Sequence, residues 1–193
     1  MKTNRRFGRP AFTLIELMAV ITIIVILASL VVAGLSFVTE RQAKEKARVQ
    51  IALLTKALED YKLSNGSYPA SENSADGKNQ SKFLFKALYW DSDDDGTGVP
   101  ADTDQKIYLA DLDPLTSKQG WTTGTPSDTT KITDPWGNEY RYRSALKADG
   151  TANADTINPD FDLWSVGKDG VTEGGSTAGN LKDPKNRDDI RNF

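Results

Sequence analysis

The chain of 193 residues contains neither cysteine nor histidine. Without cysteine it can form no disulfide bond, and without histidine it lacks the usual zinc ligand and the usual general base. It also has no glycine-rich phosphate loop and no nucleophile elbow, which leaves paired carboxylates of the glycosidase kind as the remaining catalytic arrangement. Nothing in the sequence positions such a pair in a cleft. We therefore expect that the protein is not an enzyme and that packing or a metal ion stabilises it.

Charge is absent from one long stretch of the chain. Between Leu17 and Thr39 there is no charged residue. As an α-helix this stretch would be about 35 Å long, enough to cross the hydrocarbon core of a bilayer. Residues 1–11 carry basic residues and no acidic one, which is typical of the cytoplasmic side of a membrane protein. The sequence therefore predicts a single membrane-spanning helix.

A cleaved secretory signal peptide is the first alternative for this segment. The apolar core of such a peptide usually has about 7 to 15 residues and ends at a small-residue cleavage site. The uncharged stretch here is longer, and no A-x-A site closes it. A plain signal anchor stays open as a second alternative. Glu16 stands at the head of the stretch, where a carboxylate is costly unless it has a partner, so it is a candidate functional residue.

After the uncharged stretch the helical pattern continues with one apolar face. Its residues recur at steps of four and three: Ala47, Ile51, Leu54, Leu58 and Tyr61. This period is that of a helix face packed on a partner surface. Asn65-Gly66 is a typical helix stop, and Pro69 prevents continuation. We expect one helix of about 50 residues.

An acidic loop follows in the middle of the chain. Residues 91–96 read D-S-D-D-D-G, the first half of a calcium-binding loop, and Asp102 stands at the twelfth position. The candidate ligands of this second metal loop are Asp91, Asp93, Asp95 and Asp102. The terminal ligand would be Asp in place of the usual Glu. An acidic, solvated surface loop is the alternative.

The last third of the chain is typical of strands and turns. Tyr140 and Tyr142 alternate with Arg141 and Arg143, which predicts a half-exposed strand. Residues 161–165 predict a second strand.

The start of the chain resembles a known processing signal. Residues 5–18, R-R-F-G-R-P-A-F-T-L-I-E-L-M, are similar to the class III prepilin leader shared by type IV pilins and type II secretion pseudopilins. In that family a prepilin peptidase cuts before the Phe and methylates the new N-terminus. The resemblance implies cleavage between Ala11 and Phe12 and methylation of Phe12. It also implies that Glu16 pairs with the N-terminal amine of a neighbouring subunit during assembly.

Three further runs narrow the resemblance to the type II secretion major pseudopilins. They are N-G-S-Y-P at 65–69, D-P-W-G-N-E-Y at 134–140 and F-D-L-W-S-V-G-K-D-G at 161–170. The resemblance implies an α+β fold, with a long N-terminal helix packed on a small antiparallel β-sheet that carries a calcium loop. Its implied ligands are Asp169, Asp188, Asp189, Ser165 and the main-chain oxygen of Val166. The alternative is that these Asp residues only form turns.

These observations predict one soluble domain beside the anchor. The expected parts are the leader 1–11, the transmembrane and filament-core helix 12–39, and its amphipathic continuation 40–66. A variable region with the acidic loop follows at 67–130, and the β-sheet and calcium loop occupy 131–193. Loss of the leader would change the formal charge from −3 to −7, because 20 Lys and Arg would face 27 Asp and Glu. Nucleic acid is therefore not an expected partner.

The function that the resemblance implies is that of a structural subunit of the periplasmic pseudopilus driving type II secretion. Its partners would be other copies of itself, the prepilin peptidase and methyltransferase, the inner-membrane assembly platform with its ATPase, and minor pseudopilins. The protein would be anchored in the inner membrane by one span, with its C-terminal domain in the periplasm, and then extracted into the filament. The alternative is a minor pilin-like binding module of a type IV pilus, DNA-uptake or adhesion filament. Glu16 favours the first function, and the length of the segment 70–130 favours the second.

Overall fold

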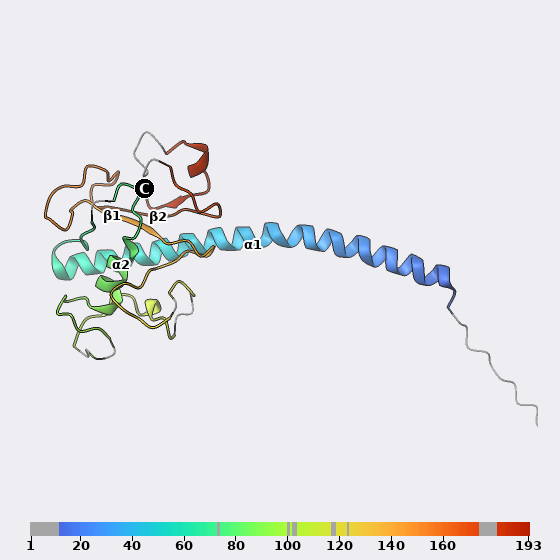
Figure 1. Ribbon diagram of the computed structural model, residues 1–193, viewed down its shortest axis with the longest axis horizontal. Helices are drawn as coiled ribbons and strands as arrows, with labels where there is room; N and C mark the ends of the chain where they lie inside the picture. The colour runs from blue at the N-terminus through green and yellow to red at the C-terminus, as the bar shows by residue number, and fades with distance from the viewer. Residues whose placement is uncertain are drawn as a thin grey trace, which may run out of the picture. The chain divides into compact units, whose positions relative to one another are not determined.

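The computed structural model describes residues 12–72, 74–99, 101, 104–116, 119–122, 124–173 and 181–193, without the side chains of residues 32–36. The chain divides into two compact units, Met1–Gln42 and Ala43–Phe193. Helix α1, Leu14–Asn65, contributes residues to both (Figure 1).

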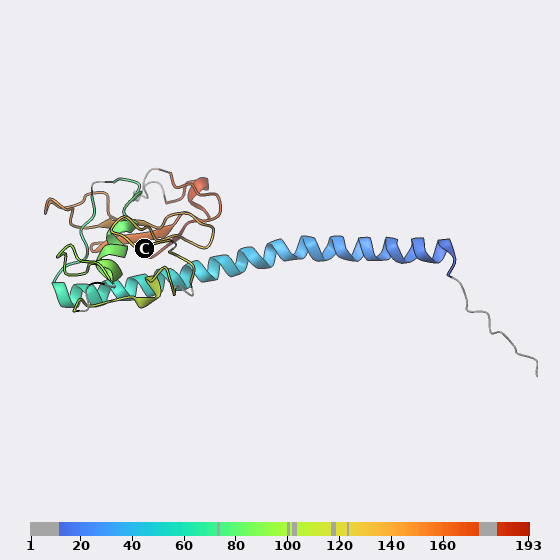
Figure 2. The ribbon, with the colours of Figure 1, turned by 60° about the horizontal axis from the view of Figure 1, so that its bottom comes forward.

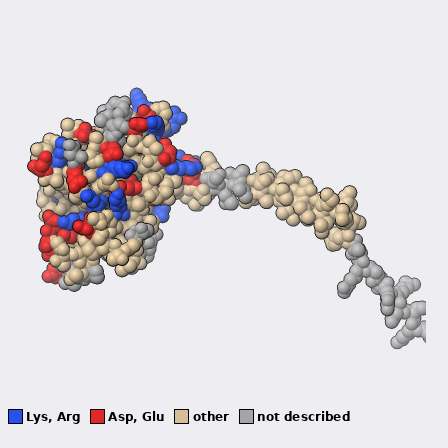
Figure 3. Space-filling view, viewed as in Figure 1, with Lys and Arg blue, Asp and Glu red and all other residues tan. Residues whose placement is uncertain are grey.

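The first unit consists of the apolar part of α1. Its window Leu14–Val31 is long and apolar enough to span a membrane, and none of that window is buried. On the face drawn in Figure 3, this part of the helix shows neither acidic nor basic side chains. Large apolar side chains exposed in a row need a nonaqueous neighbour. This unit therefore has the properties of a membrane anchor or of a helix that packs among other apolar helices.

The second unit is an α+β domain. Its sheet has three antiparallel strands in the order β1-β2-β3, with β1 at Arg141–Ser144, β2 at Phe161–Ser165 and β3 at Ile190–Arg191. Figures 1 and 2 both show the sheet lying along the second part of α1. The α+β fold class is confirmed, and so is the strand at 161–165.

The predicted apolar face of α1 forms one wall of the core. Ala47, Ile51, Leu54 and Leu58 are buried, and Tyr61 packs against the same cluster as a half-buried ring. The opposite wall comes from the sheet and its approaches, with Tyr140, Tyr142, Phe161 and Leu163. Full burial of one such apolar side chain contributes about 1.5 to 3 kcal/mol. The buried apolar face of α1 therefore packs the domain against its own helix.

The helix ends where the sequence predicts. α1 stops at Asn65, and Gly66 takes a φ of +81°, a left-handed conformation that favours glycine. The Gly66 N–H donates to the Lys62 carbonyl at 2.7 Å, which caps the last turn. Three residues after Gly66 the chain has turned back towards the sheet, because the Pro69 carbonyl accepts a hydrogen bond from the Tyr142 hydroxyl at 2.7 Å.

Short helical turns cover the rest of the core. α2 at Ser81–Phe85 continues directly into a π-helical turn, Lys86–Trp90, so the apolar run near residue 85 is helical in two parts. Its side chains Leu84, Phe85 and Leu88 are fully buried. In the described residues, 3-10 turns at Ala110–Leu112 and Pro184–Asn186 lie in the connections.

The prediction of a half-exposed strand at Arg141 and Arg143 is wrong, because all four residues of β1 are buried. Arg143 has no exposed surface and donates to Asp162 on β2 at 2.7 Å and to the Ala75 carbonyl at 2.9 Å. Its guanidinium also stacks over the Trp164 ring at 4.9 Å. The loop that carries Ala75 closes over this side of the sheet, so the face expected to be solvated is an interior.

The buried pair of Arg143 and Asp162 allows a prediction: Asp162→Ala should destabilise the fold strongly, and Asp160→Ala only weakly. Asp162→Ala leaves the Arg143 charge buried and removes the acceptor of the Ile157 and Asn158 N–H groups. We expect a loss of about 3 to 5 kcal/mol in the free energy of unfolding. The measurement is chemical unfolding of the chain in detergent, followed by the fluorescence of the buried tryptophans.

The matched control is Asp160→Ala, two residues earlier. Asp160 pairs with Lys62 at 3.2 Å, but both side chains are about half exposed. Exposed ion pairs contribute little to stability. Equal destabilisation by the two substitutions would contradict the role given to the buried pair.

Candidate assembly and metal-binding sites

The N-terminus of α1 is closed by a capping box. The Thr13 N–H and hydroxyl both donate to the Glu16 carboxylate, at 2.8 and 2.7 Å, and the Glu16 N–H points back at the Thr13 hydroxyl at 3.3 Å. Such a reciprocal pair satisfies helix N–H groups that have no intrahelical acceptor. The carboxylate at the head of the apolar segment therefore has a partner within its own chain.

Phe12, the predicted first residue after cleavage, directly precedes this box and is 85% exposed. Ala11, on the other side of the predicted cleavage position, lies outside the described residues. From Leu14 to Val31 the large apolar side chains are at least half exposed. The segment thus presents an uncovered apolar surface with a single carboxylate at its start.

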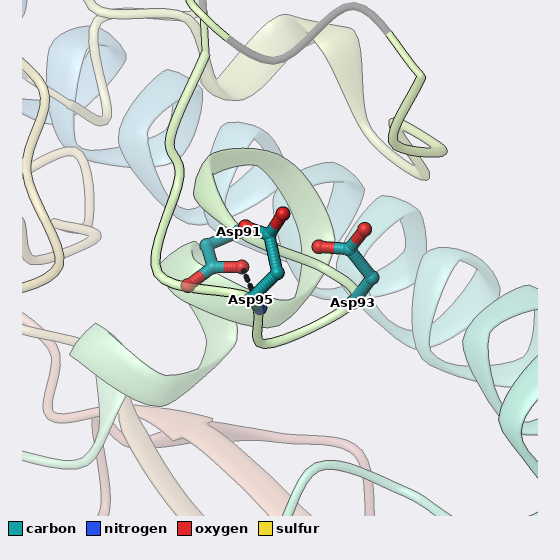
Figure 4. Close-up of side chains that lie close together, drawn as sticks. All are labelled: Asp91, Asp93 and Asp95. Atoms are coloured by element: carbon teal, nitrogen blue, oxygen red, sulfur yellow. Dashed lines mark hydrogen bonds between the residues drawn. The ribbon is translucent and has the colours of Figure 1, made fainter.

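The acidic loop brings its first three predicted ligands together. One carboxylate oxygen from each of Asp91, Asp93 and Asp95 lies within 4.8 Å of the others (Figure 4). Asp91 is buried, and the other two are exposed. The fourth predicted ligand, Asp102, lies outside the described residues.

Most of the Asp91 carboxylate is already engaged in the turn. It accepts hydrogen bonds from the N–H groups of Asp95 at 3.1 Å and Gly96 at 3.2 Å, and the Lys86 amine lies 3.4 Å away. Lys86 also pairs with Asp94. A carboxylate that accepts from successive N–H groups is typical of a turn-forming Asp. The geometry is compatible with a cation and equally with a solvated acidic turn.

The C-terminal loop contains a buried carboxylate with an unusual environment. Asp189 has no exposed side-chain surface; one oxygen accepts from the Thr172 hydroxyl and from Arg191, both at 3.0 Å. Its other oxygen is buried and has no hydrogen-bond partner among the described residues. Burial raises the pKa of this carboxyl group, which the bonds from Arg191 and Thr172 oppose. A buried oxygen without a partner is costly, and a hard cation is one of the partners that a carboxylate oxygen can take.

The two ends of the same loop meet at Asp188. Its carboxylate accepts the Asp169 N–H at 3.1 Å and lies against Gly167, where an added Cβ would stand 2.5 Å from the carboxylate oxygen. Gly167 also has a φ of +66°, so a glycine is needed on both grounds. In the described part of the chain, Asp169, Asp188 and Asp189 do not form a set of three as close as that of the acidic loop.

Sequence reasoning missed the role of Asp134 beside this loop. The Ser165 hydroxyl donates to its carboxylate at 2.6 Å, and the N–H groups of Trp136 and Asn138 donate to it at 3.0 and 2.8 Å. Burial raises the pKa of Asp134, and these hydrogen bonds oppose the rise. The D-P-W-G-N turn thereby holds the end of β2, and the Asn138 amide extends the clamp to the Gly167 carbonyl at 2.7 Å. An Asp at the start of a turn often accepts a hydrogen bond from the backbone N–H two residues later. The D-P-W-G-N run is the sequence signal that could have indicated this role.

Ser165 is therefore held in place from two sides. Its hydroxyl oxygen accepts the Gly167 N–H at 3.1 Å, and the same hydroxyl donates a hydrogen bond to Asp134. Val166, which contributes only its main-chain oxygen to the predicted ligand set, is fully buried next to it. The structure thus places the candidate oxygens of residues 165 and 166 at the hydrogen-bonded end of β2.

Comparison with known proteins defines first the class and then the family. Residues 7–32 match the model of the prokaryotic N-terminal methylation motif, which with the exposed apolar helix defines a pilin-like protein. Residues 37–93 and 96–183 match the model described as "Type II secretion system (T2SS), protein G". The chain belongs to this family, that of the major pseudopilins.

Similar proteins carry the same name. "Type II secretion system core protein G" of Pseudomonas aeruginosa is 31% identical, over 89% of this chain and 92% of its own length. The protein of that name from Escherichia coli K12 is 33% identical, over 82% of this chain and 81% of its own. The crystal structure of the major pseudopilin from the type 2 secretion system of enterohaemorrhagic Escherichia coli is 20% identical, with a TM-score of 0.41, over 82% and 93% of the two chains.

The Asp134 clamp predicts a stability effect. Asp134→Ala leaves the N–H groups of Trp136 and Asn138 and the Ser165 hydroxyl without their acceptor in a partly buried place. We expect a loss of about 2 kcal/mol or more in the free energy of unfolding. Chemical unfolding of the chain in detergent measures it. The control is Asp149→Ala, which removes a comparable but exposed turn acceptor of Thr151; a similar loss there would speak against the clamp.

Proposed function

We propose that the protein is a structural subunit of the periplasmic pseudopilus that drives type II protein secretion, and that it polymerises through the first part of α1. The observation that carries this is the uncovered apolar surface from Leu14 to Val31, headed by one carboxylate. In the membrane, lipid covers this surface. In a filament, the same helices from other copies cover it.

Cleavage after Ala11 and methylation would leave a cationic amine on Phe12. In the filament this amine would lie near the Glu16 carboxylate of a neighbouring copy. The match to the methylation motif over residues 7–32 supports this processing. A buried ion pair sets register more reliably than it adds stability, because desolvation offsets much of the attraction. The capping box keeps the Glu16 carboxylate hydrogen-bonded until the amine arrives.

The processing enzyme would be a prepilin peptidase with methyltransferase activity. Assembly would use an inner-membrane platform and its ATPase, with minor pseudopilins at the filament. The chain itself would have no catalytic role, and its domain would lie in the periplasm. The family match over residues 37–93 and 96–183 supports the major subunit over a minor pilin-like binding module.

The role of Glu16 as an ionic partner is tested with Glu16→Gln. Gln also serves at the N3 position of a capping box, so the helix start is kept while the negative charge is lost. We expect membrane insertion at the wild-type level and loss of filaments, because the neighbouring amine has no counter-ion. Membrane fractionation and electron microscopy of sheared filaments give the two readouts.

The complementary variant is Thr13→Ala, which breaks the box and keeps the carboxylate. It should still form filaments. If Glu16→Gln assembles normally while Thr13→Ala does not, helix capping and not the ion pair is the function of Glu16.

We also propose that a calcium ion joins the ends of the C-terminal loop. The buried Asp189 oxygen that has no partner among the described residues supports this, as does the meeting of Asp188 with the segment 167–169. Asp169, Asp188, Asp189, Ser165 and Val166 would supply hard oxygen ligands, the donor set that calcium prefers. Bound calcium would neutralise the carboxylates and fix the loop, whose composition gives it little apolar surface to bury.

Calcium should raise the thermal unfolding midpoint of the chain in detergent relative to chelator. A ligand specific to the folded state adds about 2.7 kcal/mol at a hundred times its dissociation constant, which is several degrees for a domain of this size. Asp188→Ala should remove the shift, and Asp128→Ala, at an exposed carboxylate outside both loops, should retain it.

The double variant Asp93→Ala/Asp95→Ala distinguishes calcium binding by the acidic loop from calcium binding by the C-terminal loop. A shift that persists in Asp188→Ala and disappears in the double variant would place the calcium in the acidic loop. That result would overturn the C-terminal site.

A further inference from the structure

A groove runs between the second part of α1 and the C-terminal strand. It encloses about 660 Å³, and its walls come from residues 48–56 of α1 and residues 189–192. Ile51, Ala52 and Ile190 supply its apolar lining, and Arg48, Lys56 and Arg191 supply its charge. All of these residues belong to the second unit. The groove is therefore an apolar trough edged by cations.

The positive charge of this groove is only partly compensated within the chain. The one acid that lines it, Asp189, is bonded to Arg191 at 3.0 Å. Arg48 pairs with Glu45 one turn earlier, where both side chains are about two-thirds exposed, and such surface pairs hold a charge weakly. Lys56 is exposed and forms no ion pair within the described residues. The edge formed by Arg48 and Lys56 is thus available to an acidic partner.

Two lining side chains also have a polar atom without a partner. The Thr55 hydroxyl oxygen and Nε of Arg191 are buried and have no hydrogen-bond partner in the described part of the chain. Buried polar groups in folded proteins are nearly always satisfied, and each exception costs free energy. A polar chain seated in the groove, after a small rearrangement of its walls, could supply these partners.

The same molecule carries a surface of opposite charge. The acidic loop holds four carboxylates, Asp91 and Asp93 to Asp95, and Lys86 pairs with Asp91 and Asp94. The Asp94 side chain is 82% exposed. In Figure 1 the green segment that contains this loop lies across α1 from the red C-terminal segment that forms the groove. The acidic and basic surfaces therefore lie on different sides of the same domain.

We propose that the acidic loop of one copy docks against the cation-edged groove of the next copy. The inference rests on the proposed polymer and adds to it a contact between the soluble domains. A contact that joins two different surfaces of identical subunits is heterologous, and it propagates as a ring or a helical filament. The loop brings excess negative charge to the groove, and its backbone N–H and C=O groups come with it.

This contact acts on register and spacing more than on affinity. Exposed ion pairs are individually weak and are screened over about 8 Å at physiological salt. Like-charge contacts are disfavoured, so the pattern excludes a groove-to-groove or loop-to-loop arrangement. The apolar part of α1 would hold the copies together. The contact between domains would set the register and spacing of successive copies.

Because the native chain has no cysteine, the contact can be tested by cross-linking without background. Lys56→Cys and Asp94→Cys are combined in the full chain, assembled in the membrane and treated with a short thiol-specific cross-linker. A head-to-tail contact gives a ladder of dimers, trimers and higher species. Each single variant can give dimers at most. The matched control pairs Lys56→Cys with Asp149→Cys, an exposed acid outside the loop, and should give no ladder.

Charge reversal in the same background tests the electrostatic basis. Arg48→Glu should abolish the ladder, and Asp93→Lys added to it should restore the ladder. The ladder should also weaken as salt concentration rises. Filaments are scored in parallel by electron microscopy.

Filaments without a ladder would overturn the docking contact and leave the proposed polymer intact; the groove would then serve another acidic partner or none. An unchanged ladder in Arg48→Glu would overturn the charge complementarity. Absence of filaments from the native chain would overturn the proposed function and, with it, this inference.

Discussion

The structure depends on the packing of the second part of α1 against the sheet. Leu54 and Leu58 have no exposed surface, and around them the core gathers aromatic rings from segments far apart in the sequence. Tyr68 packs edge-on against Phe161 at 4.8 Å, and the Tyr140 hydroxyl reaches Gln50 on α1 at 2.8 Å. Without this contact the second part of α1 would have no apolar partner within the chain. The domain would then lose the surface on which its short strands are ordered.

Beyond this core, polar contacts hold the sheet because its strands are short. β2 has five residues and β3 has two, too few for the ladder alone to be stable in water. The interior pair of Arg143 and Asp162 ties β1 to β2 and to the loop before α2, and Asp134 ties the end of β2 to the preceding turn. Buried polar groups that are well satisfied specify one arrangement of a small core. The C-terminal loop is built on the strand end that these contacts fix.

Several features followed from the sequence because their causes are local. The span, the period of the buried face of α1 and the stop at Asn65-Gly66 each depend on residues close together in the chain. The burial of Arg143 did not follow, since the tyrosine and arginine alternation is equally typical of a half-exposed strand. Only the return of residues 75 and 162 to the same place converts that face into an interior. The Asp134 clamp was missed for the same reason, because Ser165 is 31 residues away.

The sequence by itself determined the family, the membrane-competent helix and the candidate ligand residues, because apolar length, leader motif and turn chemistry are written in short runs. Tertiary structure alone decided which of those residues meet. It engaged Glu16 in a capping box with Thr13, and left one buried oxygen of Asp189 without a partner among the described residues. It also put a cation-edged groove and an acidic loop on different flanks of one domain. The physical reason is that burial and pairing depend on long-range packing, which one-dimensional periodicity does not specify.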